Sequence, residues 1–235
     1  MDVPVYQKIE NEIKESIRLG KLKSGDLLPS ENVLKEQYNV SRMTVRQALN
    51  NLVNEGYVYR HKGKGTFVQQ QKIDKLIHGV RSFTEEMMST NRTVKNKIIR
   101  FEVIQANSEL AEKLFLQEGD EVFAIERVRY GGEIPVLFEE LFVPKQIFRN
   151  LEKDVFKGSF YKFVESQNYK ISHCIQIIEV KKADEKKADY LKIEKSDSVL
   201  KITRNTFLNN GRPFEYVRSS YRADQYRFIQ YAFKG

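Results

Sequence analysis

Positive charge is concentrated in one short stretch of this 235-residue chain. The formal net charge is +8, yet residues 1–40 carry no excess of lysine and arginine over acidic residues. Residues 41–75 do carry an excess, since Glu55 and Asp74 are their only acidic side chains. The cationic residues of this stretch are Arg42, Arg46, Arg60, Lys62, Lys64, Lys72 and Lys75. Such a patch is typical of proteins that bind a phosphate backbone, although charge alone also fits a solvated surface.

A second group of arginines lies on a strand predicted from Val122 to Tyr130. Alternate residues of a strand share one face. This face carries Phe123, Ile125, Arg127 and Arg129. Two like charges on an otherwise apolar face need a partner, because burying them unpaired is unfavourable. A bound anion such as phosphate is one partner. Ion pairs with Glu139 or Glu140 on the next strand are the alternative, and spacing alone leaves both open.

A carboxylate and a phenol hydroxyl share one face of the last strand-like segment, residues 214–228. The face carries Glu215, Val217, Ser219 and Tyr221. Such groups can hold the hydroxyl groups of a sugar in a pocket. An aromatic-rich core strand with solvated arginines is the alternative, and the segment alone does not separate the two.

The sequence shows no pattern typical of catalysis or of a metal site. The three histidines are scattered, at His61, His78 and His173. Glu139 and Glu140 are neighbours on a predicted strand, so they point to opposite faces and cannot act as an acid–base pair. The run Gly63-Lys64-Gly65-Thr66 is similar to a phosphate-binding loop, but the first glycine of that motif is absent and no helix follows. We therefore predict no catalytic residue, no metal and no cofactor.

Composition predicts a globular protein of the cytoplasm. Apolar residues make up 40% of the chain and charged residues 31%. No apolar run approaches the ~18 residues of a membrane helix, and the charged N-terminus is unlike a signal peptide. The single cysteine, Cys174, cannot form an internal disulfide, and its neighbours Ile175 and Ile177 predict a buried thiol.

Three helices are predicted in the first part of the chain. Pro4 suits the first turn of a helix that has an isoleucine every four residues. Ser30 is a suitable N-cap for a second helix, Glu31–Tyr38, and Ser41 for a third helix that ends at Gly56. The short second helix and the tight break before the third suggest a helix-turn-helix.

The third helix has a polar face opposite an apolar one. The apolar face carries Val45, Ala48, Leu49, Leu52 and Val53. The opposite face carries Met43, Arg46, Gln47 and Asn50. Arg42 and Thr44 lie in the first turn, where they can reach a phosphate or a base edge. A helix of this kind fits the major groove of DNA, where guanidinium groups pair with guanine.

A basic hairpin follows the third helix. Residues 57–60 alternate like a strand, residues 61–65 form a glycine-rich turn, and residues 66–68 return as a second strand. Lys62 and Lys64 supply positive charge, and Gly63 and Gly65 allow the turn to approach a sugar–phosphate wall closely. The first part therefore reads as a winged helix-turn-helix.

In combination, these motifs resemble the GntR family of bacterial regulators. The resemblance rests on Leu28-Pro29-Ser30-Glu31, Val40-Ser41-Arg42-Met43-Thr44-Val45-Arg46-Gln47-Ala48-Leu49, Gly56 and Gly63-Lys64-Gly65-Thr66-Phe67-Val68. It implies that Arg42 and Arg46 read operator bases or phosphates, that Thr44 holds a phosphate, and that Gly63 enters the minor groove. Asn32 stands where many members carry arginine, so a base contact is expected to differ. The predicted DNA-binding residues are Asn32, Arg42, Thr44, Arg46, Gln47, Lys62, Gly63, Lys64 and Gly65.

The rest of the chain contains an internal repeat. Gln69–Lys72 is a polar hinge, and we predict a DNA-binding domain over 1–70, a linker over 71–76 and a second domain over 77–235. The pattern of Ala111–Arg127 recurs 77 residues later as Ala188–Arg204. Each copy continues to a glycine turn, a proline and another strand-like run. We predict a duplicated helix–strand–turn–strand unit, and hence an α+β domain with an antiparallel sheet.

The second domain resembles the effector-binding domain of the HutC-type branch of the family, often called UTRA, which is similar to chorismate lyase in fold. The resemblance rests on Ser82-Phe83-Thr84-Glu85-Glu86-Met87, Arg127-Val128-Arg129, Ile134-Pro135, Ser159-Phe160-Tyr161 and Phe214-Glu215 through Tyr226. Within the branch, the chain is most similar to repressors of N-acetylglucosamine utilisation. The resemblance implies that Arg127, Arg129, Ser159 and Tyr161 surround a phosphate. It also implies that Ser82, Phe83, Glu215 and Tyr221 line the sugar side.

These resemblances imply a metabolite-responsive repressor that a phosphorylated (amino)sugar releases from its operator. N-acetylglucosamine-6-phosphate and glucosamine-6-phosphate are the candidate effectors. Other members of the branch sense trehalose phosphate, histidine-pathway compounds or fatty acids. A homodimer held by the C-terminal domains is expected on a palindromic operator in double-stranded DNA, because one winged helix reads only a few base pairs.

Two rival functions come from other classes. A lyase-like enzyme could be fused to a DNA-binding arm, although a shared fold does not carry chemistry with it. Turnover of chorismate would support that enzyme. An architectural DNA binder without an effector is the second rival, and no metabolite would shift its melting temperature.

Overall fold

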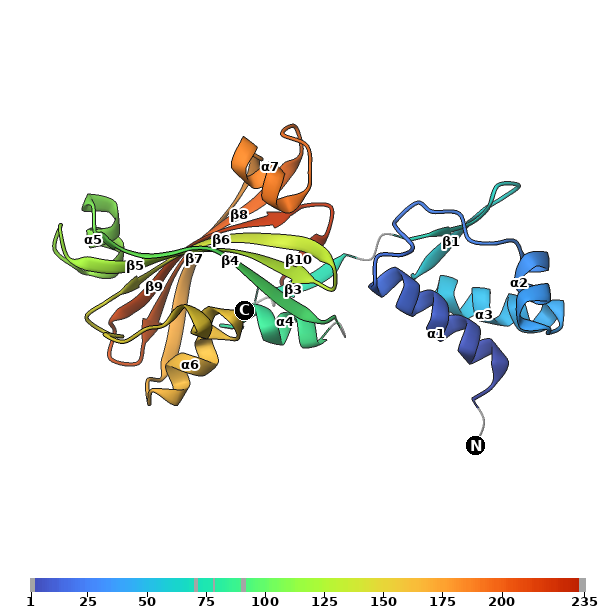
Figure 1. Ribbon diagram of the computed structural model, residues 1–235, viewed down its shortest axis with the longest axis horizontal. Helices are drawn as coiled ribbons and strands as arrows, with labels where there is room; N and C mark the ends of the chain where they lie inside the picture. The colour runs from blue at the N-terminus through green and yellow to red at the C-terminus, as the bar shows by residue number, and fades with distance from the viewer. Residues whose placement is uncertain (1–2, 70–71, 78, 90–91, 233–235) are drawn as a thin grey trace. The chain divides into compact units, whose positions relative to one another are not determined.

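The computed structural model describes residues 3–69, 72–77, 79–89 and 92–232. The chain divides into two compact units, Met1–Lys72 and Ile73–Gly235. Figure 1 shows helices and a small hairpin in the first unit and a large twisted sheet in the second. Each unit has a hydrophobic core of its own.

The first unit is a winged helix-turn-helix, as predicted. It consists of α1 (Val5–Arg18), α2 (Glu31–Tyr38), α3 (Arg42–Asn54), β1 (Val58–His61) and β2 (Gly65–Val68). The Ser30 and Ser41 hydroxyls accept hydrogen bonds from the amides of Val33 and Thr44, at 3.3 and 3.1 Å. These caps satisfy amides that the helices themselves leave unpaired, so α2 and α3 begin where the serines stand. Ile9, Leu34, Val45, Leu49, Leu52 and Val58 are among the core residues.

The second unit is built on a six-stranded antiparallel sheet with the order β4-β5-β6-β9-β8-β7. The strands are β4 (Val94–Gln105), β5 (Glu121–Gly131), β6 (Ile134–Pro144), β7 (Ile171–Lys182), β8 (Ser198–Leu208) and β9 (Pro213–Arg222). Its helices are α4 (Phe83–Ser89), α5 (Ser108–Leu114), the 3-10 helix η1 (Lys153–Lys157), α6 (Phe160–Ser166) and α7 (Glu185–Leu191). The predicted α+β class and antiparallel sheet are confirmed.

The order of the strands follows the internal repeat. Helix α5 with β5 and β6 forms one half, and α7 with β8 and β9 forms the other. The halves meet where β6 pairs with β9, with Leu141 opposite Val217. Each half also contains a long edge strand, β4 or β7, that the repeat did not include. Residues 77 apart, such as Arg127 and Arg204, therefore occupy matching positions on β5 and β8.

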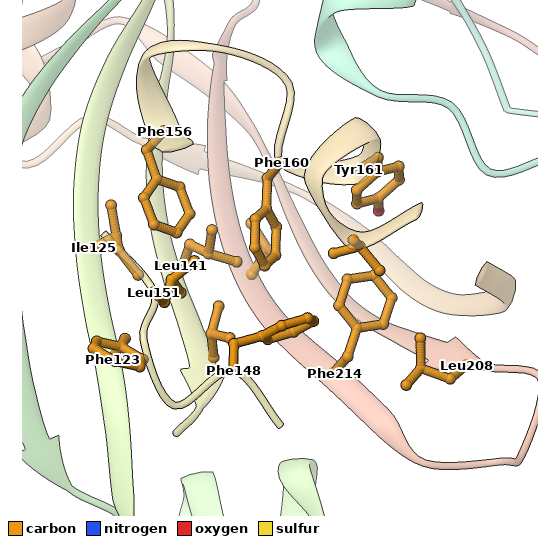
Figure 2. Close-up of a cluster of buried hydrophobic side chains, with 13 residues drawn as sticks. Phe123, Ile125, Leu141, Phe148, Leu151, Phe156, Phe160, Tyr161, Leu208 and Phe214 are labelled. Carbon is orange, nitrogen blue, oxygen red and sulfur yellow. The ribbon is translucent and has the colours of Figure 1, made fainter. Parts of the chain in front are cut away.

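Helices cover both faces of the sheet (Figure 1). Helices α5 and α7 pack on one face, for example through Leu110 and Leu191. Helices α4 and α6 and η1 pack on the other. On this second face, Phe156 and Phe160 stack with ring centroids 5.1 Å apart and lie against sheet residues such as Ile125 (Figure 2). A separate apolar cluster on the same face joins α4 to the sheet through Phe83 and Tyr221.

The segment predicted as a linker, 71–76, is partly a strand. Ile73–Leu76 forms β3, which pairs in parallel with β10 (Tyr226–Ile229). The local sequence does not reveal this strand, because its partner is 153 residues away at the Asp74–Arg227 pair. The second unit therefore begins before residue 77. Gln70 and Gln71 of the predicted hinge, and His78, lie outside the described residues.

The prediction that Cys174 is a buried thiol is wrong. The side chain is half-buried, and its neighbours Ile175 and Ile177 are 61% and 60% exposed. The reason is the position of β7 at the edge of the sheet, where a strand has a neighbour on one side only.

Candidate functional site

The exposed face of α3 and the loop of the hairpin border one groove on the first unit. Residues 27–32, the start of α3 and the loop between β1 and β2 line this groove. A second hollow continues along α3. The residues predicted to bind DNA all line one or the other: Asn32, Arg42, Thr44, Arg46, Gln47, Lys62, Gly63, Lys64 and Gly65. The structure therefore brings them to one surface.

One carboxylate, Glu31 at the start of α2, holds three arginines of this surface. Its Oε2 atom accepts hydrogen bonds from Nε of Arg42 and of Arg46, both at 3.1 Å. Its Oε1 atom lies 3.6 Å from Nη2 of Arg60. Burial favours a higher pKa for Glu31, but hydrogen bonds from the arginines outweigh this effect and lower the pKa. The arginine side chains remain 43–60% exposed, so Glu31 orders cations that solvent still reaches.

The loop of the hairpin has a backbone shape that favours glycine. Gly63 and Gly65 have φ values of +75° and +123°. A Cβ atom on Gly65 would lie 2.6 Å from Cδ1 of Leu27, whereas one on Gly63 would meet nothing within 4 Å. The absence of a side chain at Gly65 therefore allows the hairpin to pack against Leu27 of the same unit. Gly63 stands clear at the tip between Lys62 and Lys64, where a wing would approach DNA.

The second unit contains a pocket between the two apolar clusters on the face that α4 and α6 cover. The cavity itself is narrow, with a volume of about 20 Å³, within a region of about 420 Å³ that includes open solvent, so its lining must move apart to admit a sugar phosphate. The residues predicted to bind the effector all line it: Ser82, Phe83, Arg127, Arg129, Ser159, Tyr161, Glu215 and Tyr221. They come from the segment at α4, from β5, from the start of α6 and from β9, so the fold gathers four separate parts of the chain.

Arg127 and Arg129 share one carboxylate in this pocket. Glu139 lies directly opposite Arg127 on β6, and its Oε2 atom accepts a hydrogen bond from Arg127 Nε at 2.6 Å. The same oxygen lies 3.6 Å from Nη1 of Arg129. These side chains are only 4–6% exposed. The ion-pair alternative is therefore present, with Glu139 as the partner, and one carboxylate leaves the charge of two arginines only half balanced.

Burial and charge shift the pKa values of these groups in a consistent way. Burial favours a higher pKa for Glu139, but the two arginines outweigh it and lower the pKa to about 2. Burial, followed by repulsion from Arg127, lowers the pKa of Arg129 to about 10. Both groups are therefore charged at neutral pH.

Tyr161 and Glu215 are in direct contact. The Tyr161 hydroxyl donates a hydrogen bond to Glu215 Oε1 at 2.7 Å, and the Thr206 hydroxyl donates to the same oxygen at 2.7 Å. The family resemblance implied that Tyr161 lies on a phosphate side and Glu215 on a sugar side. In this structure the two sides meet at the Glu215 carboxylate.

The pocket lining carries more positive than negative charge. Its cationic residues are Lys75, Arg81, Arg127, Arg129 and Arg204. Its carboxylates are Glu86, Glu139 and Glu215. Five positive against three negative side chains leave an excess of two, so the pocket favours an anion.

Two protein-family models match this chain over the regions that carry these two sites. The model described as "Bacterial regulatory proteins, gntR family" matches residues 5–68, and the model described as "UTRA domain" matches residues 89–227. The chain belongs to the GntR family of bacterial regulatory proteins. Ser82 and Phe83 of the pocket precede the UTRA match.

Relatives of this GntR-family regulator align over nearly its whole length. "HTH-type transcriptional repressor NagR" of Bacillus subtilis (strain 168) is 40% identical and covers 97% of this chain and 95% of its own. "Mannosyl-D-glycerate transport/metabolism system repressor MngR" of Escherichia coli (strain K12) is 33% identical, with 96% and 94% covered. The crystal structure of PhnF from Mycobacterium smegmatis has a TM-score of 0.74 at 24% identity, covers 99% of this chain and 100% of its own, and shows the same fold. This GntR-family protein is a DNA-binding transcription regulator.

Several charged residues that line the two sites of the regulator were not among the residues predicted from the sequence. Arg204 was detectable, because it repeats Arg127 at the offset of 77. Lys75 was not, because its segment read as a linker. Its ammonium group pairs with Glu86 of α4, both side chains being at most 7% exposed, and lies 5.4 Å from the centre of the Tyr221 ring. The role of Glu31 depends on contacts between helices that sequence spacing does not give.

A clustered metal site and a membrane-spanning helix are both absent from the described part of this regulator. Within those residues, no group of three or more His, Cys, Asp or Glu side chains is placed to hold a metal ion. None of the described helices combines the length and apolar character needed to cross a membrane.

Proposed function

We propose that this GntR-family regulator is a repressor whose operator binding responds to a phosphorylated amino sugar in the pocket of the second unit. The observation that carries the proposal is the pocket lining, with five cationic side chains and three carboxylates. A phosphate monoester carries a charge of about −1.5 to −2 at neutral pH, which matches this excess. The similarity to NagR and to MngR, both named as repressors, supports the proposal.

The phosphate binds beside Arg127 and Arg129. These two guanidinium groups share Glu139, so a further anion completes the balance of charge. Ser159 and Tyr161 border the same region, and Ser82, Phe83, Glu215 and Tyr221 line the remainder of the pocket around the sugar. N-acetylglucosamine-6-phosphate and glucosamine-6-phosphate are the first candidates.

The first unit binds the operator through α3 and the hairpin. Arg42 and Arg46 contact bases or phosphates in the major groove, with Gln47 beside them, and Thr44 holds a phosphate. Lys62, Lys64 and the glycine tip between them contact the backbone at the minor groove. Asn32 lies in the same groove and alters one base contact.

A homodimer on a palindromic operator completes the proposal. Edge strand β7 exposes Ile175, Ile177 and Val180 at 60–67%. Phe115, 70% exposed, lies beside Phe207 of β8 with ring centroids 6.1 Å apart. Apolar side chains gathered near an open sheet edge are typical of an interface, and a second copy is the proposed partner. The dimer acts on DNA in the cytoplasm and catalyses no reaction.

Lys75 provides a route from the pocket to the first unit. Strand β3 begins at Ile73, directly after the last residue of the first unit. Lys75 on this strand lines the pocket and pairs with Glu86 on α4. A bound anion attracts Lys75 and competes with Glu86, so the affinity for the anion depends on the position of β3. The difference in anion affinity between two positions of β3 couples effector binding to operator binding.

A gel-shift titration tests the proposed function. The purified protein is bound to a duplex carrying the promoter region of its own gene, and each sugar phosphate is added in turn. We expect release of the duplex by a phosphorylated amino sugar and no release by the same sugar without phosphate. Binding that ignores duplex sequence, or a specific complex that no sugar phosphate dissociates, would contradict the proposal.

A further inference from the structure

Arg204 on β8, whose side chain is 15% exposed, is the counterpart of Arg127 in the second half of the sheet. Arg204 lies 77 residues after Arg127, and both line the pocket. The strand pairing differs between the halves, since Arg127 lies opposite Glu139 and Arg204 lies opposite Val217. The second half therefore has the arginine without the carboxylate directly across from it.

Arg204 has a carboxylate that balances its charge, but one of its N–H groups has no hydrogen-bond acceptor. Nη2 of Arg204 lies 3.7 Å from Glu215 Oε1, which allows an ion pair and exceeds hydrogen-bonding distance. That oxygen already accepts hydrogen bonds from the hydroxyls of Tyr161 and Thr206. Within the described residues, Nε of Arg204 is buried and has no hydrogen-bond partner. A buried N–H group without an acceptor is unfavourable, and a ligand oxygen would remove that penalty.

The two sets of arginines in the pocket therefore need different ligand groups. Arg127 and Arg129 share one carboxylate, so they need negative charge. Arg204 has Glu215 beside it, so it needs an acceptor but no further negative charge. An uncharged carbonyl oxygen meets this need. An ammonium group does not, because it offers only donors and brings a like charge toward the guanidinium.

We propose that Arg204 binds the effector and selects an N-acylated amino sugar phosphate by donating its Nε–H to the acyl carbonyl oxygen. This inference rests on the proposed function, because it takes a phosphate beside Arg127 and Arg129 as its starting point. N-acetylglucosamine-6-phosphate carries both the anion and the carbonyl. Glucosamine-6-phosphate has an ammonium group in place of the amide.

Calorimetric titration of the full chain tests the selection with four probes: inorganic phosphate, glucose-6-phosphate, glucosamine-6-phosphate and N-acetylglucosamine-6-phosphate. We expect the N-acetylated compound to bind roughly tenfold or more tightly than the free amine, as for one hydrogen bond to a charged group. Arg204→Lys keeps a positive charge beside Glu215 and removes the Nε–H donor. Arg204→Lys should lower the affinity for the N-acetylated compound about tenfold, whereas the affinity for inorganic phosphate should change by less than about twofold.

Arg218→Lys is the matched control. Arg218 lies on the neighbouring strand β9, pairs with Glu109 and does not line the pocket, so the affinities of all probes should stay unchanged. Unaltered binding of inorganic phosphate to Arg204→Lys also shows that the variant is folded.

Three outcomes would overturn the inference. In the first, wild type binds the free amine as tightly as the N-acetylated compound. In the second, Arg204→Lys lowers the affinity for every probe equally, and in the third it lowers the affinity for none. In these cases the anion site of the proposed function still stands. If wild type binds none of the four probes, the proposed function fails and this selection fails with it.

Discussion

Each of the two units has a glutamate that pairs with several arginines, and the two clusters differ in burial. On the first unit, Glu31 holds Arg42, Arg46 and Arg60, and the side chains are 21–60% exposed. In the second unit, Glu139 holds Arg127 and Arg129, and the side chains are 4–6% exposed. Water and salt weaken the ion pairs of the first cluster and hardly reach those of the second. Burial is therefore the property that separates the two sites.

This difference matches two kinds of ligand. Exposed guanidinium groups can turn from Glu31 to an extended polyanion at little energetic cost. Enclosed guanidinium groups can meet only an anion small enough to enter the pocket, but they meet it without competition from water. Under the proposed function, the exposed cluster serves the operator and the buried cluster serves the effector. Each of the following predictions tests that contrast.

Removal of the central carboxylate should give the largest difference between the units. Glu139→Ala leaves two buried arginines without their partner and should destabilise the protein by about 3–5 kcal/mol. Glu31→Ala is the matched control, and its exposed pairs should contribute only about 0–1 kcal/mol. Urea unfolding followed by circular dichroism measures both. Similar losses for the two variants would show that burial does not separate the clusters.

Inorganic phosphate sharpens the same comparison. Phosphate can take the place of the missing Glu139 carboxylate, so it should raise the melting temperature of Glu139→Ala more than that of wild type. The melting temperature of Glu31→Ala should respond to phosphate as wild type does. A Glu139→Ala protein that ignores phosphate would argue against an anion site at Arg127 and Arg129.

Loss of the Lys75 ammonium should separate effector binding from DNA release. Allosteric coupling is typically worth about 1–3 kcal/mol, or about 5–150-fold in affinity. Lys75→Met should still bind the effector, yet the effector should change its operator affinity by less than about twofold. Lys95→Met is the control, because Lys95 is an exposed lysine outside the pocket. Fluorescence anisotropy on labelled operator, with and without effector, measures the coupling. Normal release by Lys75→Met would contradict the proposed route.

Acid should weaken the buried cluster over a defined range of pH. Glu139 has a pKa of about 2 in the folded protein against 4.5 for an ordinary glutamate. A lowered pKa gives stability that is complete above the ordinary value and is lost as pH falls from about 4.5 toward about 2. Glu139→Gln should lack this part of the acid dependence. Urea midpoints across that range test the prediction, and parallel curves for variant and wild type would refute it.

Much of the first unit could be predicted from sequence because its signals are local. Ser30 and Ser41 mark helix starts within a few residues, and Gly63 marks the hairpin loop. The duplicated halves of the second unit were also visible, since Arg127 and Arg204 share a repeat. Strand β3 was hidden because its partner is far away in sequence, and Lys75 was hidden with it. Contacts such as Glu31 with Arg60 depend on packing between elements, which no spacing in the sequence reveals.

The smallest expected effect concerns the salt dependence of DNA binding. Lys64 lies in the exposed hairpin loop and contacts a phosphate under the proposed function. Lys64→Ala should reduce the magnitude of the negative slope of log affinity against log salt by about 1. It should lower the affinity for all duplexes similarly. Lys186→Ala, an exposed lysine of α7 in the second unit, is the control. An unchanged slope for Lys64→Ala would place Lys64 outside the DNA contact.

The most direct test measures both ligands on one arginine from each cluster. Arg42→Ala should weaken operator binding by about 1–3 kcal/mol and leave sugar phosphate affinity unchanged. Arg127→Ala should abolish sugar phosphate binding and retain operator binding that the effector no longer releases. If each folded variant loses both activities, or if the losses are exchanged, the assignment of the exposed cluster to DNA and of the buried cluster to the effector is wrong.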